Sequence, residues 1–261
     1  MFSLYFSAFN LIKNKFPYEE NLKKALAFGE EVVVAVNKSD DNTLAKLLAF
    51  ADSRLKIVET DFSYDDIRFD GAIKNAALQA STQPVKIQMD LDEYIPLSQK
   101  PKWESYAKKL LSFGNVDCFL IPSIDLYGSP DKIRAHTDIG VKFRMHKAGF
   151  YRGIHKDAWV TNNKIRTDLS DTTELIDSGG NIASAIRIAP RESHISFLAS
   201  SLQDYIYTIH EGYLSFEHRV NINKSVWAKA WRDRSGKDEN TPISVDQLKP
   251  VETTFHNLKL D

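Results

Sequence analysis

The first half of the chain alternates short apolar runs with amphipathic stretches of helical periodicity. This alternation is typical of a parallel β-sheet whose strands are connected by helices. The run at residues 31–36 is nearly continuous in its apolar character, as expected of a strand buried on both faces. The sequence therefore predicts an α/β fold with a mostly parallel central sheet flanked by helices. We expect strands at residues 2–6, 31–36, 55–58 and 85–89, and helices at 18–28, 43–51 and 70–80.

The second half of the chain has a less regular pattern. Its strands are expected to be partly antiparallel, because no long crossover separates them, so that this part of the sheet is mixed. Between residues 156 and 194, Asn, Asp and Gly favour turns or a mobile loop. Further elements are expected at residues 101–113 (helix), 116–126, 141–145 and 205–209 (strands) and 216–232 (helix).

The composition excludes several classes of function. With 34 basic and 35 acidic residues, the net charge of −1 provides no field that would attract nucleic acid. The single cysteine, Cys118, excludes an intramolecular disulfide framework and is expected to fill the core. We find no signal peptide and no run of roughly 20 apolar residues that could span a bilayer. We expect a cytoplasmic protein without a membrane span. Peripheral contact with a membrane is compatible with this sequence.

The cluster Asp90-Leu91-Asp92-Glu93 directly follows the fourth expected strand. Open α/β sheets bind ligands at the carboxyl ends of their strands, where the segments 7–10 and 37–41 also lie. These three loops are therefore expected to form one cleft. Two carboxylates separated by a single residue suit a hard divalent cation such as Mg²⁺ or Mn²⁺, which bridges carboxylates to substrate phosphates. The alternative is that the acidic cluster is an ordinary solvated turn.

Four motifs, in order, resemble those of family 2 glycosyltransferases of the GT-A fold, closest to the branch of lipopolysaccharide core transferases. The motifs are Ser7-Ala8-Phe9-Asn10, the stretch from Val32 to Thr43, Asp70-Gly71-Ala72-Ile73-Lys74-Asn75-Ala76-Ala77-Leu78, and Ile87 to Glu93. The resemblance covers about the first 95 residues. Beyond them Phe143-Arg144, Gly153-Ile154-His155 and the segment from Ile209 to Phe216 resemble later elements of the branch.

This resemblance implies a Rossmann-like GT-A domain and a hexosyltransferase-type glycosyltransferase. The expected reaction moves a sugar from a nucleoside diphosphate sugar, with a UDP-sugar favoured, to a glycan or other hydroxyl acceptor, with inversion and with Mg²⁺ or Mn²⁺. Residues 1–95 would bind the donor, 96–234 would shape the acceptor side, and 235–261 would form a polar tail. The implied metal ligands are Asp90, Asp92 and His210. The implied donor-binding residues are Ser7, Ala8, Phe9, Asn10, Asn37, Asp41, Lys74, Asp90 and Leu91.

The sequence departs from the family pattern at three positions. Val36, followed by Asn37, stands where the family carries an Asp that contacts the nucleobase, and Lys74 replaces an Arg, which keeps the charge and loses the bidentate fork. Lys156 stands where a Glu follows the family's His. Asp157 is therefore our first candidate for the general base that an acceptor hydroxyl requires. Its competitors are Asp168, Asp171 and Glu174, and both His155 and His210 have an alternative, purely structural role.

Two other readings of the sequence remain open. A nucleotidyltransferase shares the α/β layout and the carboxylate-bound metal, but the chain lacks a Gly-rich basic loop after its first strand. A non-catalytic nucleotide-binding or carbohydrate-binding module is the third possibility. The expected helix at 216–232 carries Trp227 and Trp231 beside basic residues, a pattern more typical of packing with a solvated face than of binding to anionic lipid.

Overall fold

The computed structural model describes residues 1–63, 69–127, 129–130, 132–134, 141–152, 159–161, 164–166, 175–176, 185–187, 205–213 and 248–250. The expected helix at 216–232 lies outside these residues, as does most of the loop expected at 156–194.

Four parallel strands form the core of the sheet. They are β1 (Phe2–Ala8), β2 (Glu31–Asn37), β3 (Leu55–Thr60) and β4 (Val85–Gln88), in the spatial order β3-β2-β1-β4. All four were expected from the apolar runs. The α/β class with a mostly parallel sheet is therefore confirmed.

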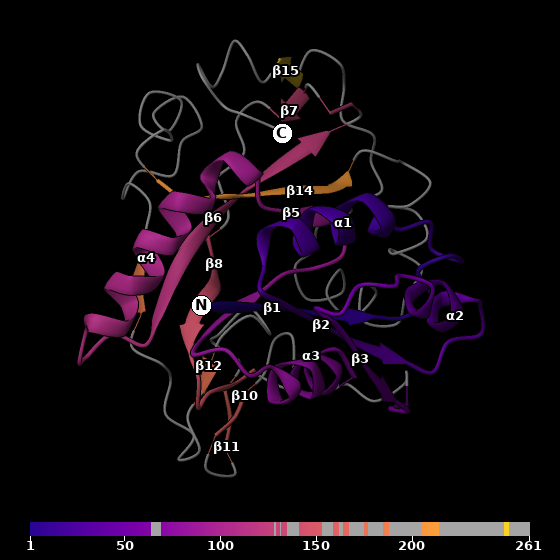
Figure 1. Ribbon diagram of the computed structural model, residues 1–261, viewed down its shortest axis with the longest axis horizontal. Helices are drawn as coiled ribbons and strands as arrows, with labels where there is room; N and C mark the ends of the chain where they lie inside the picture. Colours follow the sequence, from indigo (N-terminus) through magenta and orange to yellow (C-terminus); the bar gives the residue numbers. More distant parts are fainter. Residues whose placement is uncertain are drawn as a thin grey trace.

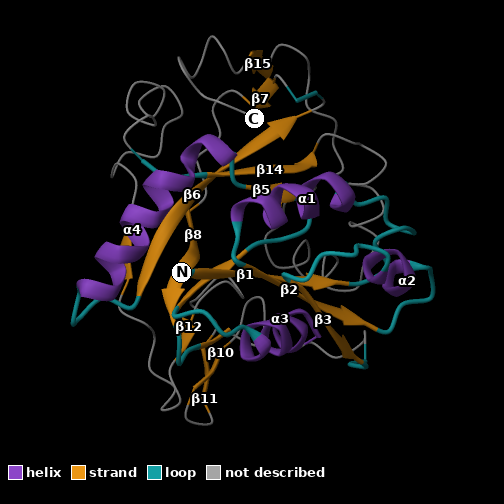
Figure 2. Ribbon diagram, in the orientation of Figure 1, coloured by secondary structure: helices purple, strands orange, loops and turns teal. Residues whose placement is uncertain are grey.

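Helices cover both faces of these strands (Figures 1 and 2). The side chains of the strands alternate between the two layers. Leu4 and Phe6 of β1 pack in the core on the side of α1, whereas Tyr5 between them packs in the core on the side of α3. This alternation follows from the two-residue period of a strand. The helices are α1 (Tyr18–Phe28), α2 (Thr43–Leu48), α3 (Phe69–Ala80) and α4 (Lys100–Ser112), with a 3₁₀ turn η1 at Leu97–Gln99.

The second half of the chain extends the sheet with strands of mixed direction, as expected. Strand β8 (Val141–Lys147) is antiparallel to β4, and β6 (Cys118–Tyr127) is antiparallel to β8. Strand β14 (Thr208–Tyr213) runs parallel to β6 and antiparallel to the short β5 (Glu93–Tyr94). The other short strands are β7 (Lys132–Arg134), β9 (Tyr151–Arg152), β10 (Trp159–Thr161), β11 (Lys164–Arg166), β12 (Leu175–Ile176), β13 (Ala185–Arg187) and β15 (Leu248–Pro250).

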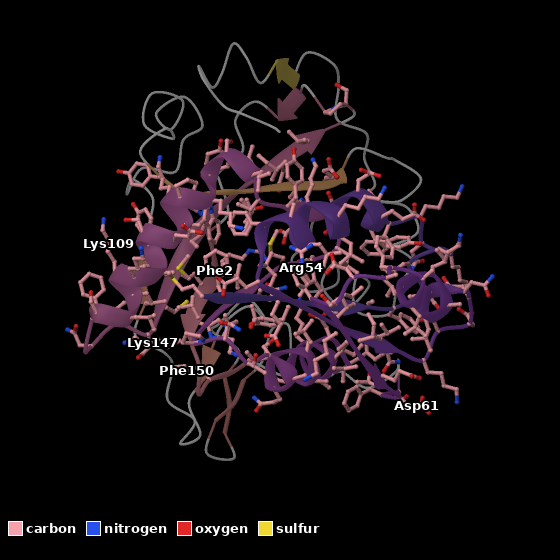
Figure 3. The ribbon with its side chains drawn as sticks, in the orientation of Figure 1. Phe2, Arg54, Asp61, Lys109, Lys147 and Phe150 are labelled. Carbon is pink, nitrogen blue, oxygen red and sulfur yellow. The ribbon has the colours of Figure 1, made fainter. Side chains whose placement is uncertain are left out.

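The strand order reverses between β1 and β4. From β1 the chain builds β2 and β3 outward on one side, and it then returns to place β4 on the other side. Such a reversal opens a crevice at the carboxyl ends of the two central strands, where open α/β sheets bind their ligands. Asp61, just after β3, lies at this edge of the sheet, and Lys147, the last residue of the antiparallel β8, lies at the opposite edge (Figure 3).

Two further expectations concern burial and membranes. The side chain of Cys118 is fully buried in β6, as expected of a core residue. No helix in the described part of the chain combines the length and the apolar character needed to cross a bilayer.

Candidate functional site

The acidic turn Asp90–Glu93 follows β4, at the carboxyl edge of the parallel strands. Its ends are joined by two reciprocal hydrogen bonds, in which the Glu93 N–H donates to the Asp90 carbonyl oxygen at 2.9 Å and the Asp90 N–H donates to Glu93 Oε2 at 2.9 Å. Asn21, buried on α1, donates to the Leu91 carbonyl oxygen at 3.2 Å, and the Glu211 N–H of β14 donates to the Asp92 carbonyl oxygen at 2.7 Å. The backbone of the turn is thus hydrogen-bonded to both α1 and β14. The turn is therefore anchored in the fold and is not an ordinary solvated turn.

Behind the turn, a buried arginine connects β8 to the turn. Arg144 forms an ion pair with Glu93, and both side chains are fully buried. Arg144 Nη1 also donates to the carbonyl oxygen and to Oε1 of Gln88, at 3.1 and 2.8 Å. Gln88 in turn donates from Nε2 to Oδ1 of Asp90 at 3.0 Å. One guanidinium thus orients both the backbone and the side chain of Asp90.

His210 on β14 lies between two carboxylates. Its Nε2 is 3.4 Å from Oδ2 of Asp92, and its Nδ1 is 2.9 Å from Oδ1 of Asp125 on β6. Burial by itself would lower the pKa of His210, but the charges of Asp92 and Asp125 outweigh it and raise the pKa to about 10. Without a bound cation, the ring is therefore an imidazolium at neutral pH.

Lys74 on α3 faces the other acid of the turn. Its side chain is only 7% exposed, and Nζ lies 2.9 Å from Oδ2 of Asp70 and 3.4 Å from Oδ1 of Asp90. A buried ammonium beside the acidic turn is placed to meet a third anionic group, such as a phosphate, as well as its two acidic partners. The structure therefore brings Asp90 to Lys74, and Asp92 to His210.

The donor atoms of Asp92 and His210 fit a divalent cation. Two neighbouring ligands on an octahedral ion, each bound at ~2.1 Å, lie roughly 3 Å apart, close to the 3.4 Å between Asp92 Oδ2 and His210 Nε2. Carboxylate and imidazole suit Mn²⁺, which also accepts water and phosphate oxygens at its remaining positions. Within the described residues no three His, Cys, Asp or Glu side chains converge as a complete metal site. Protein side chains here would supply only part of the coordination shell.

The loops after β1 and β2 are bonded to each other at the same edge of the sheet. Asn10 adopts a left-handed conformation with φ of 49°, and its Oδ1 accepts the Asp40 N–H at 3.0 Å. The carboxylate of Asp41 accepts the N–H groups of Lys13 and Thr43, both at 2.9 Å. Hydrogen bonds offset the burial of this carboxylate and lower the pKa of Asp41 below its ordinary value. Asn10 and Asp41 thus shape the loops at the carboxyl edge of β1 and β2.

Asn37 has its side chain bonded to the segment after β3. Its Oδ1 accepts from Thr60 Oγ1 at 3.0 Å and from the Phe62 N–H at 2.8 Å, and its Nδ2 donates to the Phe62 carbonyl oxygen at 3.1 Å. In this way Asn37 holds the neighbouring loop, in which the Phe62 side chain is 40% exposed.

The remaining residues that were expected to bind the donor lie at the end of β1 or in the turn. Ser7 is partly buried and Ala8 is buried at the carboxyl end of β1, and Phe9 packs edge-to-face against Phe69 with ring centroids 5.0 Å apart. The Leu91 side chain is buried in the main core, and its carbonyl oxygen accepts a hydrogen bond from Asn21 of α1.

Several candidates from the sequence lie outside the described residues. These are the proposed base Asp157, its competitors Asp168, Asp171 and Glu174, and His155. Conversely, the sequence did not single out Asp125, Asn21 or Glu211 as parts of the site. For Asp125 a signal exists, because it is the one acid within the otherwise apolar and hydroxylic run of β6.

Comparisons with known proteins find similarity only at the level of structure. No family model and no curated protein matches the chain. Similar solved structures include the 1–349 fragment of S. aureus TarS, with 14% identity and a TM-score of 0.47 over 89% of this chain and 68% of that chain. Another is the mannosyltransferase PcManGT from Pyrobaculum calidifontis in complex with GDP-Man and Mn²⁺, with 20% identity and a TM-score of 0.36 over 46% of this chain and 34% of that one. At such identities and TM-scores the likeness assigns no activity.

A third similar structure is glucosyl-3-phosphoglycerate synthase from Mycobacterium tuberculosis in complex with Mg²⁺ and UDP. It shares 15% identity and a TM-score of 0.31, over 48% of this chain and 43% of that chain. The chain also spans only 41% of the longer TarS chain.

Proposed function

We propose that the chain is a GT-A glycosyltransferase that binds a nucleoside diphosphate sugar through a divalent cation and transfers the sugar to a hydroxyl acceptor. The observation that carries this proposal is the pairing of Asp92 with His210 at 3.4 Å, next to Asp90 and Lys74, at the strand-order reversal of the sheet. The ordered motifs of the first 95 residues support it independently.

In this proposal some groups of the site bind the cation and others contact the donor. Asp92 and His210, together with Asp90, would hold Mg²⁺ or Mn²⁺, and Lys74 would contact a phosphate oxygen. The cation, when bound, stabilises the negative charge that develops on the departing diphosphate. The loops after β1, β2 and β3, with Asn10, would border the nucleoside, for which we favour uridine.

Transfer also requires a group that accepts the proton of the attacking hydroxyl. Asp157 stays our proposed base, and inversion at the anomeric carbon is part of the proposal. The division into a donor half (1–95), an acceptor half (96–234) and a tail (235–261) is likewise proposed.

Isothermal titration calorimetry tests the proposal. UDP, GDP and CDP are titrated into the full chain with and without Mn²⁺, and we expect binding of one of them that strengthens at least tenfold with the metal. Asp92→Asn should remove the metal dependence. Asp117→Asn, just before β6 and at the opposite edge of the sheet, is the matched control and should bind as the wild type does. Absence of nucleotide binding in every arm would sink the proposal.

The two rival functions give different results in a companion assay. Slow release of free sugar from UDP-sugar, without an acceptor, is expected of a transferase in which water replaces the acceptor. A nucleotidyltransferase would instead release pyrophosphate from a nucleoside triphosphate and a sugar phosphate. A binding module would bind UDP and turn over neither substrate.

A further inference from the structure

We propose that Asp125 is a positioning residue for the metal site: it holds the imidazole of His210 so that Nε2 is directed at Asp92 and at the cation. This inference rests on the proposed function, since it assigns a role to a residue next to the proposed metal ligands. In this role Asp125 acts on the metal site through His210, which it contacts directly.

The geometry of two neighbouring strands sets this arrangement. Strands β6 and β14 run parallel, and His210 pairs in register with Asp125. The register brings the two side chains close enough for the 2.9 Å contact between Asp125 Oδ1 and His210 Nδ1. The two nitrogens lie on opposite sides of the ring, so Nε2 is turned away from β6 and toward Asp92, which it faces at 3.4 Å.

The chemistry of a histidine ligand gives this contact its consequence. A cation binds a ring nitrogen only through its free lone pair, so one nitrogen must carry the proton while the other binds. A carboxylate that accepts from Nδ1–H selects the tautomer with its lone pair on Nε2 and makes that nitrogen a stronger ligand. Asp125 is placed to do both. Asp92, the other carboxylate that faces His210, lies on the Nε2 side of the ring, where the cation would bind.

The exposed fractions of the side chains of Asp92, His210 and Asp125 allow the positioning role of Asp125 to be tested apart from a role in stability. Asp92 and His210 are 8% and 14% exposed, but Asp125 is 36% exposed at the rim of the site. The loss of a half-buried carboxylate should leave the packed core unchanged. Its replacement therefore tests the orientation of the ring rather than the stability of the fold.

The experiment measures Mn²⁺ binding to the full chain by calorimetry and by electron paramagnetic resonance of the free ion, with UDP at saturation. We expect Asp125→Ala to weaken Mn²⁺ binding by about 10-fold to 100-fold, the usual effect of losing an outer partner of a histidine ligand. Asp125→Asn, which still accepts from Nδ1–H but lacks the charge, should lie between Asp125→Ala and the wild type. Asp117→Ala is the control. Urea unfolding of each variant shows whether the fold is intact, and Asp125→Asn carries the test if the alanine variant is unfolded.

A double-mutant cycle with His210→Ala distinguishes action through the ring from any direct effect. If Asp125 acts through His210, Asp125→Ala causes no further loss of Mn²⁺ affinity in the His210→Ala chain. Equal Mn²⁺ affinity of wild type and Asp125→Ala, or losses that add in the double variant, would overturn the positioning role while leaving the proposed function intact. A wild type that binds no Mn²⁺ in the presence of UDP would overturn both.

Discussion

Arg144 on β8 and Glu93 on β5 form an ion pair whose two side chains are completely buried behind the acidic turn. Glu93 accepts the Asp90 N–H with its other oxygen, so the pair connects the interior of the sheet to the first acid of the site. Buried charges are costly to desolvate and do not by themselves favour folding. This pair therefore serves the placement of the turn, and that role can be separated from stability.

Arg144→Met should destabilise the protein by about 3–5 kcal/mol, because it leaves the Glu93 carboxylate buried and uncompensated. Urea unfolding measures this loss. The double variant Arg144→Met/Glu93→Leu should recover much of the stability, since apolar side chains replace both charges. Its metal-dependent nucleotide binding should stay weak, because the Asp90 N–H loses its acceptor. A double variant that binds like the wild type would contradict the placement role.

Lys74→Met should weaken binding of a nucleoside diphosphate by roughly tenfold or more, because a hydrogen bond to a charged group contributes ~1.5–3 kcal/mol. Calorimetry with UDP and Mn²⁺ measures the change. Lys74→Arg should retain most of the affinity. The control is Lys56→Met, on the exposed edge of β3, which also removes one positive charge. The Nζ of Lys56 donates to the Ala80 carbonyl oxygen and not to an acid of the turn. If Lys74→Met and Lys56→Met have equal effects, Lys74 does not contact the phosphates.

Gly29→Ala should destabilise the fold by about 1–3 kcal/mol through overpacking. A Cβ at Gly29 would lie 2.6 Å from Cδ1 of Leu4, which is buried in β1, and 3.2 Å from the Glu31 carbonyl oxygen. The φ of Gly29, −85°, is accessible to any residue, so the penalty comes only from the lack of space for the added carbon. Gly114→Ala is the matched control. Apart from its chain neighbours, no heavy atom of the described residues lies within 4 Å of the added carbon, and the unfolding free energy should change by less than about 0.5 kcal/mol. Thermal unfolding of both variants makes the comparison, and equal losses would contradict the prediction.

Glu31 should contribute an acid-sensitive part of the stability. Burial would raise the pKa of Glu31, but hydrogen bonds from the Ser3 hydroxyl and from the backbone and hydroxyl of Thr82 outweigh this and hold the pKa below its ordinary value of 4.5. A carboxylate with a lower pKa in the folded chain stabilises it above pH 4.5, and this contribution disappears as the pH falls through the folded-state value.

The melting temperature of Glu31→Gln should therefore lie below that of the wild type at pH 7, and the difference should shrink below pH 4.5. Glu59→Gln, on an exposed position of β3, is the control for removal of a carboxylate. A difference between wild type and Glu31→Gln that stays constant from pH 7 to pH 3 would rule out this account.

Local patterns in the sequence determined the first half of the fold. The apolar runs and helical periods predicted β1 to β4, α1 and α3 to within a few residues, because each of these elements is defined by its own side chains. Helix α2 is shorter than predicted and ends at Leu48 rather than at Ala51. The convergence of Asp90, Asn10 and Asn37 at one edge also follows from sequence, since the carboxyl ends of parallel strands meet.

Only the tertiary structure decided which group each acid faces. Asp125 and His210 lie 85 residues apart, and Arg144 and Glu93 lie 51 apart, so no local periodicity relates them. Their contacts arise because β8 inserts between β4 and β6, and because β14 pairs with both β5 and β6. Strand order of this kind depends on the burial of whole faces against one another, which is a property of the assembled sheet. The sequence thus predicted that Asp90 and Asp92 belong to a site, and the fold assigned Lys74 to the first and His210 to the second.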